Sequence, residues 1–270
     1  GGSNVQYGEG QVTGRHLLVG GEAAGNHYFT VRAVRKAVRF LKTMNAPRYE
    51  GSYWAIIHPD CSYDIQDDPD WKRPHEYKDT SNIYDDEIGK IAGVRFIETT
   101  EAKVFHADDL TEGARDLTVK SASSKVLTVN EAITTADAAK LAGREVVIGG
   151  ALLEIESATA AGAGSATITL KEAPAATPTA STTIYPGEAG AKGRNVYSTL
   201  IMGAEAYGTT ELTGGGLEHI VKPLGSAGTA DPLNQRATVG WKATKVAERL
   251  VEAYMIRVET TSTFDETPLT

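Results

Sequence analysis

The pattern of apolar and polar positions predicts one clear helix near the start of the chain, over residues 30–44. Apolar residues recur there at helical spacing and form a single stripe, made of Val31, Val34, Val38 and Leu41. Thr30 is suited to cap the first turn, and Pro47 disfavours helix in the residue before it. We therefore expect an amphipathic helix with one buried face.

The opposite side of this helix is strongly basic. It carries Arg32, Arg35, Lys36, Arg39 and Lys42. A segregated stripe of cations favours the interpretation that this face binds a partner. The partner is either nucleic acid or the acidic surface of a neighbouring subunit, for which residues 64–70 are a candidate. A solvated helix face is the third interpretation, and the sequence leaves all three open. Exposed ion pairs contribute about 0–1 kcal/mol each, so they would set register more than affinity.

Short strands are expected on both sides of a different middle region. Residues 53–57 predict a buried strand that stops at His58 and Pro59, with Asp60 capping a short helix to about residue 67. Two short strands are expected around Gly93. In the last third, strands are predicted at 196–202, 239–244 and 251–260, a helical turn at 204–207, and a loop over 214–228.

The middle region, residues 107–195, is rich in alanine, threonine, glycine and serine and predicts only β structure apart from helical turns at 134–141. Strand candidates lie at 117–120, 125–130, 145–148, 152–157, 166–170 and 182–185. They suggest a small barrel or sandwich. The mixed helix and strand pattern that precedes this region resumes after it. We therefore expect an α+β protein with an inserted all-β domain. The expected division is 1–106, 107–195 and 196–270.

The loop from about residue 214 to residue 236 is a candidate contact surface. Its glycines permit close backbone approach, and it carries four apolar side chains and a cation: Leu217, Ile220, Val221, Leu224 and Arg236. The apolar side chains would be oddly exposed in an isolated chain, which favours contact with another subunit. The alternative is that they fill the core of their own domain.

Composition narrows the function classes. Hydrophobic residues make up 41% of the 270 residues, which is enough for a buried core, and no apolar run approaches the roughly 20 residues of a membrane span. The net charge of −8 repels nucleic acid on average, so contact with it needs a local basic patch. A single cysteine, Cys61, excludes an internal disulfide framework and a cysteine zinc site.

No catalytic, cofactor or metal site is predicted. The six histidines lack the spacing of a helical zinc site, and the acidic run from Asp64 to Asp70 lacks the glycine of a calcium loop, so we expect a solvated turn there. No nucleophile elbow is present. The nearest approach to a functional signal is His58-Pro59-Asp60, which a strand end and a helix cap explain fully. A hydrolase using His58 or Asp60 is the weaker rival.

The segments flanking the middle region carry a further pattern. They are residues 53–60 (YWAIIHPD), 63–65 (YDI), 68–71 (DPDW), Tyr77, 87–100 (EIGKIAGVRFIETT), 196–200 (VYSTL), 206–208 (AYG) and 220–243 (IVKPLGSAGTADPLNQRATVGWKA). Together these blocks resemble the phage N-four-like family of tailed-phage major capsid proteins, over most of residues 28–105 and 196–260. The long block that contains Trp241 is the most specific of them.

The resemblance implies the Hong Kong 97-type capsid fold, here an axial domain and part of the peripheral domain. It implies a structural protein that self-assembles as hexamers and pentamers into the icosahedral head shell of a tailed phage or prophage. The shell would enclose DNA, with weak non-specific contact to the packaged DNA as one role for the basic helix. Such a protein belongs to the virion and is assembled in the host bacterial cytoplasm. It is not an enzyme, binds no cofactor and does not contact a membrane.

Two departures from the family pattern bear on this expectation. Family members carry a long region before the equivalent of residues 4–8, so a chain with its N-terminal region missing is expected. Residues 107–195 also interrupt the pattern, and such an insertion is expected on the surface. The alternative function is a β-rich virion decoration or host-binding module, in which the inserted domain would recognise sugar or protein.

Overall fold

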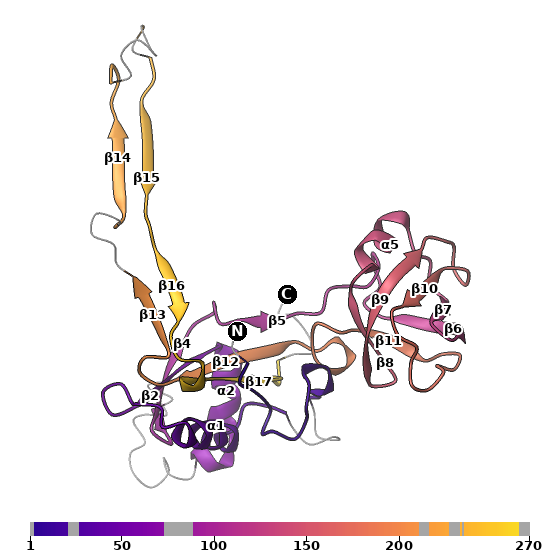
Figure 1. The fold of residues 1–270 in the computed structure, drawn as a ribbon, viewed down its shortest axis with the longest axis horizontal. Coiled ribbons are helices and arrows are strands. Elements are labelled where there is room, and N and C mark those ends of the chain that lie inside the picture. The colour runs from indigo at the N-terminus through magenta and orange to yellow at the C-terminus, as the bar shows by residue number, and fades with distance from the viewer. Residues whose placement is uncertain are drawn as a thin grey trace.

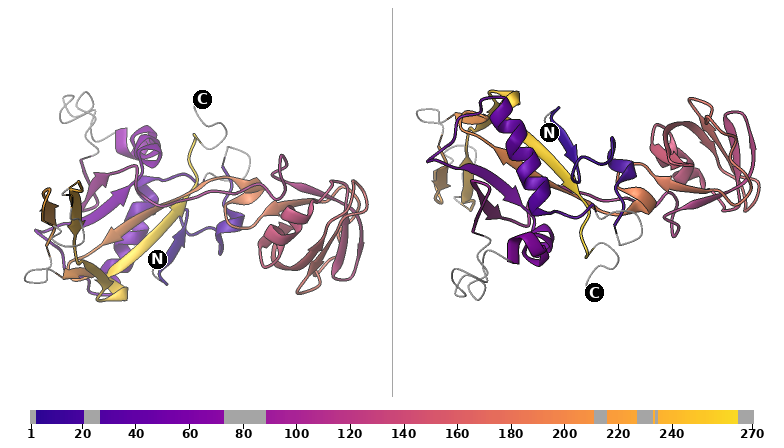
Figure 2. Two further views of the ribbon diagram at one scale, coloured as in Figure 1. Left: turned by 90° about the horizontal axis from the view of Figure 1, so that it is seen from above. Right: turned by 90° about the horizontal axis from the view of Figure 1, so that it is seen from below.

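The computed structural model describes residues 3–20, 27–72, 89–210, 216–226, 233 and 235–264. Three parts are visible in Figure 1: a central sheet with two helices, a small barrel beside it, and a long two-stranded arm that rises from the sheet. The two views of Figure 2 place helix α1 and the arm on opposite sides of the sheet. Within the described residues, no helix is long and apolar enough to cross a membrane.

Helix α1 (Val31–Thr43) confirms the first prediction. The Thr30 hydroxyl accepts a hydrogen bond from the Ala33 N–H at 3.2 Å, which satisfies one of the unpaired donors of the first turn. The whole predicted apolar stripe is buried against the sheet, where α1 packs on strands β12 and β17. The helix ends before Asn45, whose φ of 53° is left-handed.

The central sheet combines strands from both ends of the chain. Its order is β1-β17-β12-β2-β4-β3, with β5 paired to β12. These strands are β1 (Val5–Tyr7), β2 (Tyr53–Ile57), β3 (Lys90–Ile91), β4 (Val94–Glu98), β5 (Val104–Phe105), β12 (Val196–Met202) and β17 (Met255–Thr260). β12 lies antiparallel to both β2 and β17, so segments on either side of residues 107–195 share one sheet and one core.

Helix α2 (Pro59–Asp67) follows β2 as predicted, but its cap differs from the prediction. His58 is the N-cap, and its Nδ1 accepts a hydrogen bond from the Asp60 N–H at 3.3 Å. Pro59 occupies the first helical position, where a missing N–H costs nothing and the fixed φ suits the helix. Asp60 therefore lies inside the first turn, where a carboxylate stabilises the positive end of the helix.

The middle region forms a closed barrel with the strand order β10-β7-β6-β11-β8-β9. All of the strands predicted there are present: β6 (Leu117–Ser123), β7 (Val126–Val129), β8 (Glu145–Ile148), β9 (Ala151–Thr159), β10 (Thr167–Leu170) and β11 (Thr183–Pro186). Helix α5 (Thr135–Leu141) begins with a capping box between Thr134 and Asp137. Among the described residues, the core cluster of the barrel shares no side chain with that of the sheet.

The arm corrects two sequence predictions. It consists of β13 (Tyr207–Thr210), β14 (Glu218–Lys222), β15 (Thr238–Lys242) and β16 (Val246–Arg249), in which β13 pairs with β16 and β14 with β15. The predicted helical turn at 204–207 is instead a tight turn, because Glu205 has a φ of 62°. Part of the predicted loop at 214–228 is strand β14, whose backbone partners lie about twenty residues later in β15.

Three single 3-10 turns complete the described elements: η1 (Arg15–Leu17), η3 (Ala191–Gly193) and η5 (Glu252–Tyr254). The first of them supplies Arg15 to a buried ion cluster. Arg15 Nε lies 2.7 Å from Glu259 Oε2, and Arg257 Nε lies 2.8 Å from Glu259 Oε1. The Glu259 side chain is completely buried, and the Arg15 guanidinium also stacks 3.4 Å from the Phe105 ring centre. This cluster ties η1, β5 and β17 together.

Candidate subunit-contact surfaces

The strand pairing in the arm sorts its side chains onto two unlike faces. His219 lies opposite Trp241 and Val221 opposite Val239, so these four residues share one mainly apolar face. The other face carries the Glu218 and Lys242 ion pair, with 2.8 Å between Oε2 and Nζ. We call the first the apolar arm face (His219, Val221, Val239 and Trp241) and the second the polar arm face. This is the alternation of a sheet that is covered on one side.

None of the described residues covers the apolar arm face. Trp241 is 75% exposed and Val239 is 70% exposed, although both are large hydrophobic side chains. Contiguous apolar surface of this kind marks an interaction site in soluble proteins. The apolar arm face is therefore a candidate contact surface.

The strand register places the predicted apolar contact residues on different faces of the arm or outside its strands. Val221 lies on the apolar arm face, whereas Ile220 lies on the polar arm face opposite Gly240 and is half-buried. Leu217 precedes β14 and Leu224 follows it, and both are exposed, as is Arg236 before β15. The alternative that these side chains fill their own core is therefore wrong for Leu217, Val221 and Leu224.

The basic stripe of α1 is exposed at all five predicted positions. Arg32 Nε lies 3.3 Å from Glu9 Oε2, and Lys36 Nζ donates to the Glu9 carbonyl. Arg35, Arg39 and Lys42 form no ion pair with any of the described residues. Since α1 and the arm lie on opposite sides of the sheet, the fold does not bring the two predicted groups of contact residues together (Figure 2).

The acidic segment from Asp64 to Asp70, which spans the end of α2, makes several contacts within its own chain. Asp68 Oδ2 accepts a hydrogen bond from the Val31 N–H at 2.9 Å, at the start of α1. Asp64 is 7% exposed and accepts from the Thr263 hydroxyl at 2.6 Å. Burial raises the pKa of the Asp64 carboxyl above its ordinary value, although the hydrogen bonds from Thr263 and Ser262 oppose this. The prediction of a solvated turn is therefore wrong for Asp64.

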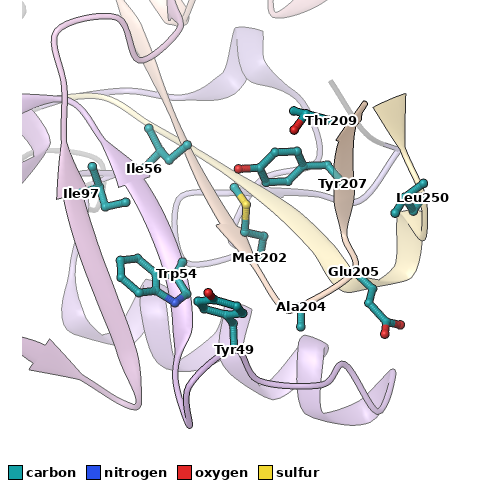
Figure 3. A pocket seen from close by; sticks show the side chains of 11 residues that line it. Tyr49, Trp54, Ile56, Ile97, Met202, Ala204, Glu205, Tyr207, Thr209 and Leu250 are labelled. Carbon is teal, nitrogen blue, oxygen red and sulfur yellow. The ribbon is translucent and has the colours of Figure 1, made fainter. Parts of the chain in front are cut away.

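An open apolar groove of about 700 Å³ lies at the base of the arm (Figure 3). It was not predicted from the sequence. Its floor is the face of the sheet that looks away from α1, and its side wall is the start of the arm. The groove is lined by Tyr49, Trp54, Ile56, Ile97, Met202, Gly203, Ala204, Glu205, Tyr207, Thr209 and Leu250. The sequence feature that pointed to this groove is the uniformly apolar strand β2, because a strand that is apolar on both faces is usually covered on both.

The residues considered for catalysis have structural contacts instead. His58 caps α2, lies 3.4 Å from Asp60 Oδ2, and packs its ring 5.0 Å from that of Tyr197. Within the described residues, no group of three or more histidine, cysteine or acidic side chains could hold a metal ion. Cys61 is fully buried, and burial raises the pKa of its thiol far above the ordinary value, so the thiolate is suppressed.

Comparison with known proteins agrees with this structural character. The sequence profile of the phage capsid protein family matches residues 27–210, which is more than half of the chain. The matched segment contains α1, α2, the barrel and strands β2 to β13. A search of curated proteins found no match. The chain therefore belongs to the phage capsid protein family, and it is a structural protein of the virion rather than an enzyme.

Proposed function

We propose that this chain is a major capsid protein of the Hong Kong 97-type fold that self-assembles into the icosahedral head shell of a tailed phage or prophage. In this proposal hexamers and pentamers of the chain tile a shell around DNA, as its resemblance to the phage N-four-like family implies. The observation that carries the proposal is the apolar arm face, whose Trp241 is 75% exposed. A surface of this kind needs a partner, and a shell supplies one at every position.

The energetics of a shell suit contacts of this size. Each arm presents only a few large apolar side chains, so a single contact is weak. Closed symmetry makes many such contacts simultaneous, and their free energies then add without any one of them being strong. The exposed cations Arg35, Arg39 and Lys42 on α1 provide a second surface, for a neighbouring subunit or for weak non-specific contact with packaged DNA.

The division into 1–106, 107–195 and 196–270 is part of this proposal. Its support is the pairing of β5 with β12, in which Phe105 lies opposite Val196 and Val104 opposite Tyr197. The chain therefore leaves the sheet and returns to it at neighbouring positions. The barrel between these positions extends to one side of the sheet (Figure 1). An insertion with adjacent ends adds little closure entropy to the domain that receives it.

Replacing residues 107–195 with a short glycine-serine linker is expected to leave the sheet folded. Phe105 and Val196 already lie opposite each other, and the two core clusters are separate. A modest loss of stability is expected, since the hydrogen bond from the Ala191 N–H to the Leu18 carbonyl is removed. Near-ultraviolet circular dichroism and urea unfolding measure the result. Loss of the cooperative transition would show that the sheet and the barrel are one folding unit.

The proposed function is tested by the assembly state of the purified chain over a range of concentrations. Sedimentation velocity measures the mass distribution, and electron microscopy shows whether the heavy fraction contains rings or closed shells. We expect reversible, concentration-dependent association into symmetric particles. A chain that stays monomeric at every concentration, with the fold intact by circular dichroism, would contradict self-assembly through its own surfaces.

A further inference from the structure

The groove at the base of the arm is lined by apolar side chains of a central strand, which is typical of a surface that is covered by another element. Strand β2 is central in the sheet, between β12 and β4. Its residues Tyr53, Ala55 and Ile57 are buried in the core, whereas Trp54 and Ile56 face the groove and are only half-buried. A central strand that is apolar on both faces is typical of sheets covered on both sides. Helix α1 covers only one of them.

The apolar arm face of the same chain cannot cover this groove. Tyr207 and Thr209 on β13, with Leu250 just after β16, form the wall from which the arm rises (Figure 3). Trp241 lies nine residues before Leu250, which corresponds to about 30 Å along an extended strand. The apolar arm face and the groove are therefore two separate apolar surfaces, and none of the described residues covers either of them.

The charge distribution favours a second copy of this chain as the partner of the arm. Residues 207–250 contain five lysines and arginines and four carboxylates, whereas the chain as a whole has a net charge of −8. The arm is thus slightly basic on an otherwise acidic protein. Lys222 and Lys242 lie on the polar arm face, away from the contact, and Lys242 is paired with Glu218. The charge of the arm therefore acts at long range, where an arm opposite in sign to the rest of the protein favours encounter between copies.

The chemistry of the two surfaces is also complementary. Trp241 and Val239 offer a large ring and a branched side chain, and the groove offers Tyr49, Trp54 and Ile97. Tyr49 is 55% exposed and Ile97 is 46% exposed, so side chains on both surfaces lose solvent contact when they meet. Aromatic side chains seated in an apolar pocket carry most of the free energy of typical protein interfaces.

We propose that the apolar arm face of one copy docks into the groove at the arm base of a second copy. This inference rests on the proposed function and names the geometry of its contact. Because the two surfaces differ, the contact is head-to-tail, and each copy gives an arm to one neighbour and receives an arm from another. A head-to-tail contact closes into a ring when its rotation permits, and it otherwise propagates.

Cross-linking between two variants, each with one added cysteine, tests the proposal. One variant carries Val239→Cys on the apolar arm face, and the other carries Ile97→Cys in the groove. The two are mixed and treated with a short bismaleimide. The native Cys61 is fully buried and does not compete for the reagent. Thr238→Cys, on the polar arm face of the same strand, is the matched control for Val239→Cys.

A cross-linked dimer is expected from the mixture of Val239→Cys with Ile97→Cys. It should be largely lost when either variant is treated alone or when Thr238→Cys replaces Val239→Cys. A dimer from Val239→Cys alone would show arm-to-arm contact and overturn the proposal while leaving self-assembly in place. Absence of any cross-link in a sample that associates by sedimentation would overturn it too. A mixture that stays monomeric by sedimentation would overturn the proposed function together with this inference.

Discussion

Replacing Trp241 with glutamate is expected to abolish self-association of the chain without unfolding it. The indole is 75% exposed, so the substitution removes nothing from a core. If Trp241 is a buried aromatic anchor in the assembled state, its loss costs about 2 kcal/mol or more per contact. That is about a 30-fold weaker contact. Because every copy in an assembly gives one arm and receives another, the loss recurs at each contact of the particle. Sedimentation velocity measures the association.

The matched control for this substitution is Thr238→Glu. Thr238 lies on the same strand and is also exposed, but it belongs to the polar arm face. This variant is expected to associate like the unaltered chain, and both variants should keep the same circular dichroism spectrum. If Trp241→Glu associates normally, or if Thr238→Glu is equally defective, the apolar arm face is not the contact surface.

Glu259→Ala is expected to produce the largest loss of stability among the substitutions considered. The Glu259 carboxylate is completely buried and lies within 2.8 Å of nitrogen atoms of both Arg15 and Arg257. Removing it leaves two guanidinium groups near each other without their counter-charge. Breaking a buried ion pair in this way costs about 3–5 kcal/mol, which is a large part of the total for a typical domain. Urea unfolding of the monomeric chain measures the difference.

The exposed ion pair between Glu218 and Lys242 serves as a control for the stability change at Glu259. Glu218 Oε2 lies 2.8 Å from Lys242 Nζ, but both side chains are more than half exposed. Glu218→Ala is therefore expected to change the free energy of unfolding by about 1 kcal/mol or less. Equal losses for Glu218→Ala and Glu259→Ala would mean that burial does not strengthen the Glu259 cluster.

The sequence predicted most accurately the helices and strands that have a strong local pattern of apolar residues. Strand β2 (Tyr53–Ile57) and strand β12 (Val196–Met202) have the predicted bounds, because both are rich in aromatic and β-branched residues and are followed closely by Pro59 and Gly203. Helix α1 was equally clear, since four residues at helical spacing and a threonine cap indicate the same start and the same buried face. Local signals and tertiary packing agree at these places.

The arm was predicted only in part, for a physical reason. Strand β14 has the sequence EHIVK, which is short and half polar, and only its pairing with β15 makes it a strand. The same pairing decides that Val221 and Ile220 point to opposite faces, which no local pattern of residues could show. The groove was missed because the run at β2 indicates that both faces will be covered but does not say by what.

The five basic positions on α1 were predicted to be exposed, and the helix period alone was sufficient for that prediction. Their pairing within the chain was not predictable. Arg32 finds Glu9 because β1 and the turn after it lie beside α1 in the folded chain. Arg35, Arg39 and Lys42 form no ion pair among the described residues, and the sequence left their partner open.

Assembly through the arm is tested most directly by a density map of the assembled particles at a resolution that traces the arm. We expect the arm to cross a subunit boundary, with Trp241 beside Tyr49 and Ile97 of the next copy. We also expect residues 107–195 to lie apart from the contacts that close the shell. A map in which each arm lies in solvent, or covers only its own subunit, would contradict the central claim that this chain assembles through its arm.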